Sequence, residues 1–157
     1  MTVSDGASGA SGRVVELAPA KVNLCLHVTG RRPDGYHELD TLVAFADLGD
    51  TVTVDRIDGE LSLHVSSGLM PADLGNTDPV VPAAVDNLAW RALALWGRET
   101  GALDGLTLGV DKRLPAGAGL GGGSSDAAAT LRALSRLTGT PPGDRLRQRS
   151  GALGAGV

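Results

Sequence analysis

A dense run of glycines directly ahead of a predicted helix is the feature that most constrains this chain. Five of its 23 glycines lie between residues 117 and 123. Glycine loses more conformational freedom on folding than any other residue, so such a run usually serves positive φ angles or close approach of the backbone to a ligand. The start of a helix adds unpaired N–H groups and the positive end of a dipole. Together these features predict an anion cradle, and the natural anion is phosphate.

The residues on both sides of the run predict an anchored loop. A strand is expected at 106–111, and a helix is expected to follow the glycines, with Ser124 and Ser125 as N-cap candidates and Gly139 as its terminator. The residues at helical spacing within it are Ala127, Leu131, Leu134 and Thr138. A flexible glycine-serine linker is the alternative, but a linker is not held between a strand and a capped helix.

Two common phosphate loops fit the run poorly. The Walker pattern needs Lys and then Ser or Thr straight after the last glycine, and no lysine follows Lys112. Gly117, Gly119 and Gly122 do spell G-x-G-x-x-G. A Rossmann site, however, needs the first glycine tight on the end of a strand and an acidic residue at the end of the next strand. The sequence favours a different cradle for nucleotide phosphates.

Composition limits the remaining classes of protein. The chain of 157 residues fits one domain, and its 42% of hydrophobic residues suffice for a core of Leu, Val and Ala, because aromatics make up only 3%. The net charge of −4 gives no indication of a nucleic-acid partner. The single cysteine, Cys25, excludes an internal disulfide and is expected to be a buried or half-buried small hydrophobe.

The ends of the chain carry expectations of their own. Residues 1–12 predict a disordered tail and no signal peptide. No apolar run reaches the ~18 residues of a membrane span, so a soluble cytoplasmic protein without a membrane partner is expected. A last helix with no later element to cover its apolar face predicts that a C-terminal half is missing after Val157.

Hydrophobic periodicity predicts strands first and helices later. Strands are expected at 13–18, 22–29, 41–48, 50–55, 61–65 and 106–111. Helices are expected at 87–99, at 125–138, and from about 143 to the chain end, with Asp86 as a cap candidate for the first. In strand 22–29, Leu24, Leu26 and Val28 are expected to share one face. This order predicts an α+β fold rather than a doubly wound sheet.

Two short stretches place polar chemistry beside apolar strands. A lone lysine, Lys21, stands at the entrance of the strand in "PAKVNL", where an edge lysine kept for solubility is the plain alternative. Tyr36 and His37 are adjacent in "DGYHEL", a turn in which such a pair is usually exposed. His27 and His64 have no partners at ligand spacing, so no protein metal site is expected.

Taken in order, four stretches are specific: "APAKVNLCLHVTGRRPDGYHELDTL", "GDTVTV", "DNLAWRA" and "DKRLPAGAGLGGGSSDAAA". They resemble the 4-diphosphocytidyl-2-C-methyl-D-erythritol kinases of the non-mevalonate isoprenoid pathway, members of the GHMP kinase superfamily. The resemblance covers residues 13–157, but only about the N-terminal half of such an enzyme. It implies a GHMP kinase N-terminal domain with the ribosomal protein S5 domain 2-like fold, a mostly antiparallel sheet with helices packed on one side.

The resemblance also implies an activity and roles for named residues. The implied reaction is ATP-dependent phosphorylation of the 2-hydroxyl group of a cytidine diphosphate derivative of methylerythritol, with Mg²⁺ bridging the ATP phosphates and a hydroxyl of Ser124 or Ser125 as one contact. Lys21 matches the catalytic lysine, Asn23 would line the substrate end, and Tyr36 with His37 would hold the cytosine. The implied ATP-binding residues are Asn87, Lys112, Pro115, Ala116, Gly117, Ala118, Gly119, Leu120, Gly121, Gly122, Gly123, Ser124 and Ser125.

One position departs from the pattern of these kinases. Their catalytic aspartate lies in a G-A-D-V-P-type stretch, which here reads "GAGV" and puts Gly156 in its place. Glycine can neither orient a hydroxyl group nor take its proton, so the chain as given is expected to be inactive. Two other interpretations stay open: another GHMP kinase of the homoserine or mevalonate type, against which "DGYHEL" argues, and a non-catalytic S5-like binding module. The oligomeric state is not predicted.

Overall fold

The computed structural model describes residues 12–57, 61–67, 86–101, 105–151 and 153. The elements in this part of the chain, in order, are β1 (Arg13–Arg31), β2 (His37–Arg56), β3 (Ser62–Ser67), α1 (Leu88–Thr100), β4 (Leu106–Lys112), α2 (Gly122–Thr138) and α3 (Asp144–Ser150).

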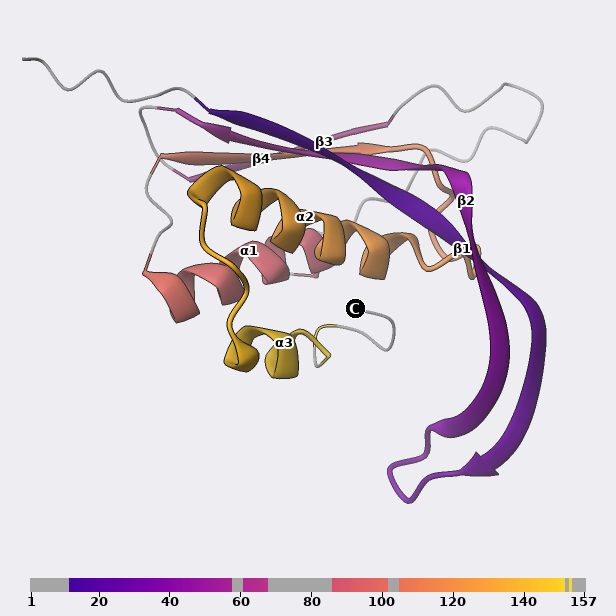
Figure 1. The fold of residues 1–157 in the computed structure, drawn as a ribbon. Helices are drawn as coiled ribbons and strands as arrows, with labels where there is room; N and C mark the ends of the chain where they lie inside the picture. The colour runs from indigo at the N-terminus through magenta and orange to yellow at the C-terminus, as the bar shows by residue number, and fades with distance from the viewer. Residues whose placement is uncertain (1–11, 58–60, 68–85, 102–104, 152, 154–157) are drawn as a thin grey trace, which may run out of the picture.

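The described strands form one sheet in the order β1-β2-β4-β3. The β1–β2 and β2–β4 pairs are antiparallel, and the β3–β4 pair is parallel. The described helices lie on one side of this sheet, with α2 directly beneath it and α3 on the outer side of the helix layer (Figure 1). The α+β class, with a mostly antiparallel sheet and helices on one side, is therefore confirmed.

The first two strands are longer than the pattern predicts. The strands expected at 13–18 and 22–29 are one strand, β1, and those expected at 41–48 and 50–55 are one strand, β2. Pro19 does not break β1, because β1 lies at the edge of the sheet and proline is tolerated where no ladder hydrogen bond is needed. Register shifts between Pro19 and Lys21, Asn23 and Cys25, and Val28 and Gly30 absorb the irregularities.

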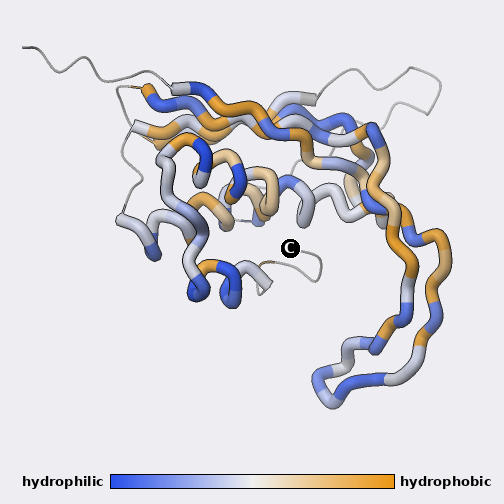
Figure 2. Tube along the Cα trace, viewed as in Figure 1, coloured by the Kyte–Doolittle hydropathy of each residue, from blue (hydrophilic) through white to orange (hydrophobic). Residues whose placement is uncertain are grey.

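Beyond the part of β2 that pairs with β4, the β1–β2 hairpin continues as a two-stranded arm, residues 20–31 and 37–48, that curves away from the sheet (Figure 1). Hydrophobic residues recur along the arm (Figure 2). Leu24 and Val28 are 63% and 61% exposed. The expectation for Cys25 is wrong, since its side chain is exposed. A two-stranded ribbon has no second layer to bury its residues against, and alternation alone does not reveal this.

The core lies between the sheet and helices α1 and α2. Trp96 is the largest fully buried side chain, and small residues such as Ala129 and Ala133 let α2 approach the sheet closely. The buried hydrophobic cluster consists of Ala18, Val52, Val54, Ala89, Leu93, Trp96, Leu106, Leu108, Val110, Ala129, Ala133, Leu134 and Leu146.

Two helix caps differ from expectation. Asn87, and not Asp86, caps α1, because its Oδ1 accepts hydrogen bonds from the N–H groups of Ala89 at 2.9 Å and Trp90 at 3.4 Å. The α2 helix begins one turn earlier than Ser125, at Gly122, with Gly121 as N-cap. The third helix starts after Gly143 as expected and ends at Ser150; residues 154–157, which the prediction also included, lie outside the described residues.

Candidate functional site

The glycine loop, residues 113–121, connects β4 to α2 and has a backbone shape that requires glycine. Gly117, Gly119 and Gly121 have φ angles of 74°, 74° and 69°. This left-handed region is costly for residues with a Cβ atom. A Cβ atom added at Gly117 or Gly119 would meet nothing within 4 Å. The free space beside Gly117 and Gly119 means that their positive φ angles, and not close packing, require glycine there, and it leaves the backbone open.

The start of α2 leaves its first-turn N–H groups without a capping side chain. Gly121 supplies no side-chain cap, and the helical ladder begins with the N–H of Ser125 donating to the carbonyl of Gly121 at 2.9 Å. Ser124 and Ser125, the expected caps, are already inside the helix. Uncapped N–H groups and the helix dipole together favour a bound anion. The helix begins one turn earlier than predicted, but the predicted combination of a glycine loop and a helix start is present.

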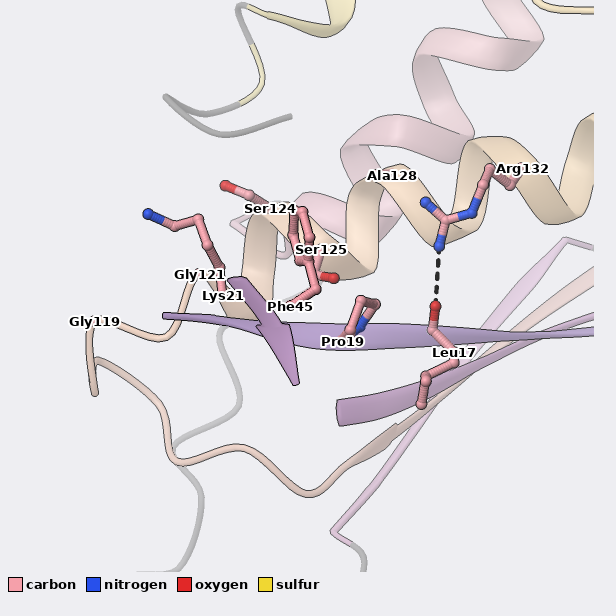
Figure 3. A pocket seen from close by; sticks show the side chains of 10 residues that line it. All are labelled: Leu17, Pro19, Lys21, Phe45, Gly119, Gly121, Ser124, Ser125, Ala128 and Arg132. Carbon is pink, nitrogen blue, oxygen red and sulfur yellow. Dashed lines mark hydrogen bonds between the residues drawn. The ribbon is translucent and has the colours of Figure 1, made fainter. Parts of the chain in front are cut away.

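Strand β1 holds the end of the loop and places Lys21 beside it. The N–H of Lys21 donates to the carbonyl of Leu120 at 2.8 Å. The Lys21 side chain passes Gly121 so closely that an added Cβ there would lie 3.4 Å from it. Its Nζ donates to Oδ1 of Asn23 at 3.0 Å. Figure 3 shows Lys21 next to Gly121 at the start of α2. An ammonium group therefore stands at the end of the predicted anion cradle.

Two cavities meet at the glycine loop. The first, here called the loop cavity, has a volume of about 420 Å³ and is lined by Asp86, Asn87, Leu88, Lys112, residues 115–123, Ser124 and Asp126. The second, the lysine cavity, has a volume of about 660 Å³ and is lined by Leu17, Pro19, Lys21, Phe45, Gly119, Gly121, Ser124, Ser125, Ala128 and Arg132. Figure 3 shows the lysine cavity, and Gly119, Gly121 and Ser124 line both cavities. The residues implied for ATP thus surround the loop cavity, except Ser125, which joins Lys21 in the lysine cavity.

The residues implied for the cytosine lie elsewhere. Tyr36 and His37 stand at the turn of the arm and are exposed. Neither lines the loop cavity or the lysine cavity. Asn23, on β1, accepts a hydrogen bond from Lys21, and its Nδ2 donates to Oγ1 of Thr41 on β2 at 2.7 Å. The arm therefore joins the turn to the loop through β1, but the structure does not bring all implied residues together.

A buried charge cluster beneath the loop was missed by the sequence reasoning. Lys112 donates to a carboxylate oxygen of Asp50 and, at 2.7 Å, to Oδ2 of Asp126. Asp50 is fully buried and also accepts from the N–H groups of Arg113 at 2.5 Å and Leu114 at 2.8 Å. Asp50 and Asp126 lie in the stretches "GDTVTV" and "GGGSSDAAA", and nothing in their local pattern distinguishes them from surface acids.

Burial changes the titration of this cluster. Burial raises the pKa of Asp126 to about 6; the ammonium of Lys112 opposes the shift, and the neighbouring carboxylate of Asp50 adds to it. Burial alone would lower the pKa of Lys112, but its hydrogen bonds to Asp126 and Asp50 outweigh that effect and raise it. Lys112 is therefore charged at neutral pH, and two carboxylates share its charge.

The described residues contain no group of three or more His, Cys, Asp or Glu side chains that could hold a metal ion. Within the same part of the chain, no helix is both long enough and apolar enough to cross a membrane.

Comparisons with known proteins point to one group of enzymes. A family model described as "GHMP kinases N terminal domain" matches residues 87–156. The chain is 47% identical over 148 residues to 4-diphosphocytidyl-2-C-methyl-D-erythritol kinase of Parvibaculum lavamentivorans, covering 94% of this chain and 48% of that protein. It is 52% identical over 123 residues to the kinase of the same name from Ruegeria pomeroyi, covering 78% of this chain and 39% of the relative. The chain thus spans about half the length, or less, of these curated relatives.

Solved structures agree with the sequence relatives. A crystal structure of 4-(cytidine 5'-diphospho)-2C-methyl-D-erythritol kinase matches with a TM-score of 0.67 and 41% identity, covering 90% of this chain and 46% of that one. Homoserine kinase from Cytophaga hutchinsonii matches with a TM-score of 0.59 at 17% identity, covering 99% of this chain and 45% of the other. The second likeness shows the fold alone.

Proposed function

This chain carries the N-terminal domain of the GHMP kinases, and we propose that it is the ATP-binding part of a 4-diphosphocytidyl-2-C-methyl-D-erythritol kinase. The proposed reaction transfers the γ-phosphoryl group of ATP to the 2-hydroxyl group of that substrate. The observation that carries the proposal is the glycine loop, whose open backbone and uncapped helix start lie beside Lys21.

The loop cavity suits the phosphates of ATP. Backbone N–H groups of residues 116–121 and of the start of α2 would hold the phosphate oxygens, because a Cβ atom added at Gly117 or Gly119 would meet nothing within 4 Å. Asn87 and Leu88 line the same cavity and would lie toward the adenosine. Mg²⁺ carried on the ATP phosphates would neutralise part of their charge, as phosphoryl transfer generally requires.

The proposed role of Lys21 is in the transfer itself. Catalysis of phosphoryl transfer consists mostly of positioning and charge neutralisation. Lys21 lines the lysine cavity, and its side chain passes Gly121, which lines both cavities, so an acceptor hydroxyl in the lysine cavity would approach the γ-phosphate near this lysine. It would stabilise developing negative charge on the attacking oxygen. Asn23, which accepts a hydrogen bond from this ammonium, would fix its direction.

The alternatives are less well supported. The likeness to homoserine kinase is at 17% identity, against 41% for the cytidine-dependent kinase structure. A non-catalytic module would not need an open phosphate cradle beside an ammonium group. Binding of ATP and of cytidine diphosphate to this chain separates these cases.

The first prediction concerns ATP. Gly119→Asn should weaken binding of ATP to the chain by about tenfold or more, because the added side chain would block a backbone N–H that contacts charged phosphate, a contact worth about 1.5–3 kcal/mol. Asparagine is chosen because it tolerates a positive φ angle. Isothermal titration calorimetry with ATP and Mg²⁺ measures the effect.

A matched control exists for this substitution. Gly139, at the other end of α2, has a φ angle of 68° and also has nothing within 4 Å of an added Cβ. Gly139→Asn should leave ATP binding unchanged. Equal weakening by both substitutions would mean that the loop has no special part in binding. Absence of ATP binding by the unaltered chain would overturn the proposed function.

The second prediction concerns the cytosine. Tyr36→Ala should weaken binding of cytidine diphosphate by the ~1–3 kcal/mol typical of base–aromatic stacking, with ATP binding unchanged. Tyr36 is 63% exposed at the turn of the arm, so its removal leaves no core cavity. Tyr36→Phe keeps the ring and should bind nearly as well as the unaltered chain. The idea fails if Tyr36→Phe and Tyr36→Ala lose the same affinity.

A further inference from the structure

We infer that Asp50 and Asp126 are positioning residues that fix the glycine loop by holding Lys112 between them. Three chain segments meet at this ammonium: β2 through Asp50, the end of β4 through Lys112, and the first turns of α2 through Asp126. The loop leaves the sheet at Arg113 and joins α2 at Gly122, so the cluster ties its two ends together. This positioning role is distinct from the proposed phosphate contacts, and only its test by ATP binding rests on the proposed kinase function.

Asp50 anchors the entrance of the loop. Its Oδ1 accepts hydrogen bonds from the backbone N–H groups of Arg113 and Leu114, and its Oδ2 accepts a hydrogen bond from Nζ of Lys112. These are the residues at which the chain turns out of β4. Asp50 is 0% exposed, and a buried carboxylate with three donors is held far more firmly than a surface acid. The entrance of the loop therefore has a fixed direction relative to the sheet.

Asp126 anchors the exit. Its Oδ2 accepts from Lys112, and its side chain is only 5% exposed. Its Oδ1 has no hydrogen-bond partner among the described residues, so the hydrogen bond from Lys112 to Oδ2 ties this side chain to the end of β4. Gly122 packs over the cluster, with an added Cβ 3.4 Å from Asp50 and 3.5 Å from the Lys112 ammonium. The start of α2, and hence its free N–H groups, is positioned by this contact.

The middle of the loop needs such support, because little else holds it. Residues 115–119 are exposed. Two backbone hydrogen bonds hold residues 115–120: the N–H of Ala118 donates to the carbonyl of Pro115 at 3.4 Å, and the N–H of Lys21 donates to the carbonyl of Leu120 at 2.8 Å. Three left-handed glycines add freedom to the unconstrained chain. A loop of this kind keeps one shape only when its ends are fixed.

Lys112 could instead act as a direct phosphate ligand, and one pair of variants decides between the two roles. Asp126→Asn and Asp126→Ala both remove the same negative charge, but only Asn retains an oxygen that accepts from Lys112. If Lys112 is a clamp, the Asn variant binds ATP more tightly than the Ala variant. If Lys112 is a phosphate ligand, freeing it makes the Ala variant bind at least as tightly. The second result would overturn the inference.

A measurement without nucleotide tests the clamp independently of the proposed function. Hydrogen exchange of backbone amides in the unliganded 157-residue chain should rise about tenfold over residues 116–124 in Asp126→Ala, and less in Asp126→Asn. Exchange in the core of β2 and β4, at residues 51–56 and 106–110, should stay unchanged. A rise of equal size in the core would show a general loss of stability and overturn the positioning role.

Asp50→Asn completes the test at the entrance of the loop. The NH₂ group of the new amide is a hydrogen-bond donor, and it would face another donor in either orientation: Lys112 or the two backbone N–H groups. Hydrogen exchange of backbone amides should therefore rise at residues 113–120. Asp55→Asn, an acid on the same strand that pairs with Arg13 at 3.5 Å on the surface, is the control and should change nothing there. If Asp50→Asn fails to fold, the Asp126 pair still decides. If the unaltered chain shows no ATP binding but the loop exchange behaves as expected, the proposed function fails and the clamp stands.

Discussion

Lys21→Met should lower kcat by about 10²–10³-fold and leave the KM for ATP nearly unchanged. The substitution is made in a chimera in which residues 13–151 of this chain replace the corresponding residues of the Parvibaculum lavamentivorans kinase, which supplies the rest of the enzyme. The loss is expected in turnover, because an ammonium beside the attacking oxygen acts mainly on charge that develops during transfer. The loop stays docked, since its contact with Lys21 uses the backbone N–H.

Arg132 provides the control for this prediction. It is the other cation that lines the lysine cavity, but its guanidinium is engaged by Glu16 at 3.2 Å and by the carbonyl of Leu17 at 2.9 Å (Figure 3). Arg132→Met should therefore leave kcat within a few-fold of the starting chimera. A loss as large as that of Lys21→Met would indicate a general charge effect of the cavity. Normal turnover by Lys21→Met would exclude the catalytic role of this lysine.

The sequence predicts the type of each element better than its extent. Alternating residues correctly indicated strands on both sides of Pro19, but they could not show that the two strands are continuous. That outcome depends on β1 being an edge strand, which is a property of the whole sheet. In the same way, Leu24 and Val28 alternate as residues of a half-buried strand do. They are exposed because no further element covers the arm in the described residues.

The loop could be predicted because its chemistry is local. Glycines and a following helix are adjacent in sequence, so the glycine run and the residues on both sides of it predict a loop that leads into a helix start. The buried cluster could not be found in this way, because Asp50 and Lys112 are 62 residues apart along the chain. Only the pairing of β2 with β4 brings them together, with Thr51 opposite Asp111. The resemblance implies a place for Lys112 at the nucleotide site, because the stretch that contains it flanks the glycine loop, whereas its contacts with Asp50 and Asp126 depend on the fold.

Gly156→Asp should raise kcat by about 10²–10⁴-fold, the usual contribution of a group that orients or deprotonates a reacting hydroxyl. Gly156 lies outside the described residues, so the argument rests on sequence: "GAGV" stands where the resembling kinases have an aspartate. The substitution is made in a second chimera that keeps residues 13–157 of this chain and takes the rest from the same Parvibaculum kinase.

The neighbouring Gly154 gives this last prediction a matched control. Gly154→Asp adds the same carboxylate two residues earlier in the same stretch, so a general effect of added charge or lost glycine would appear in both variants. Turnover of 4-diphosphocytidyl-2-C-methyl-D-erythritol should recover with Gly156→Asp alone, while the KM for ATP stays close to that of the parent chimera. High turnover by the parent with Gly156 in place would show that catalysis by this loop and Lys21 does not need the aspartate, and that positioning and charge neutralisation suffice.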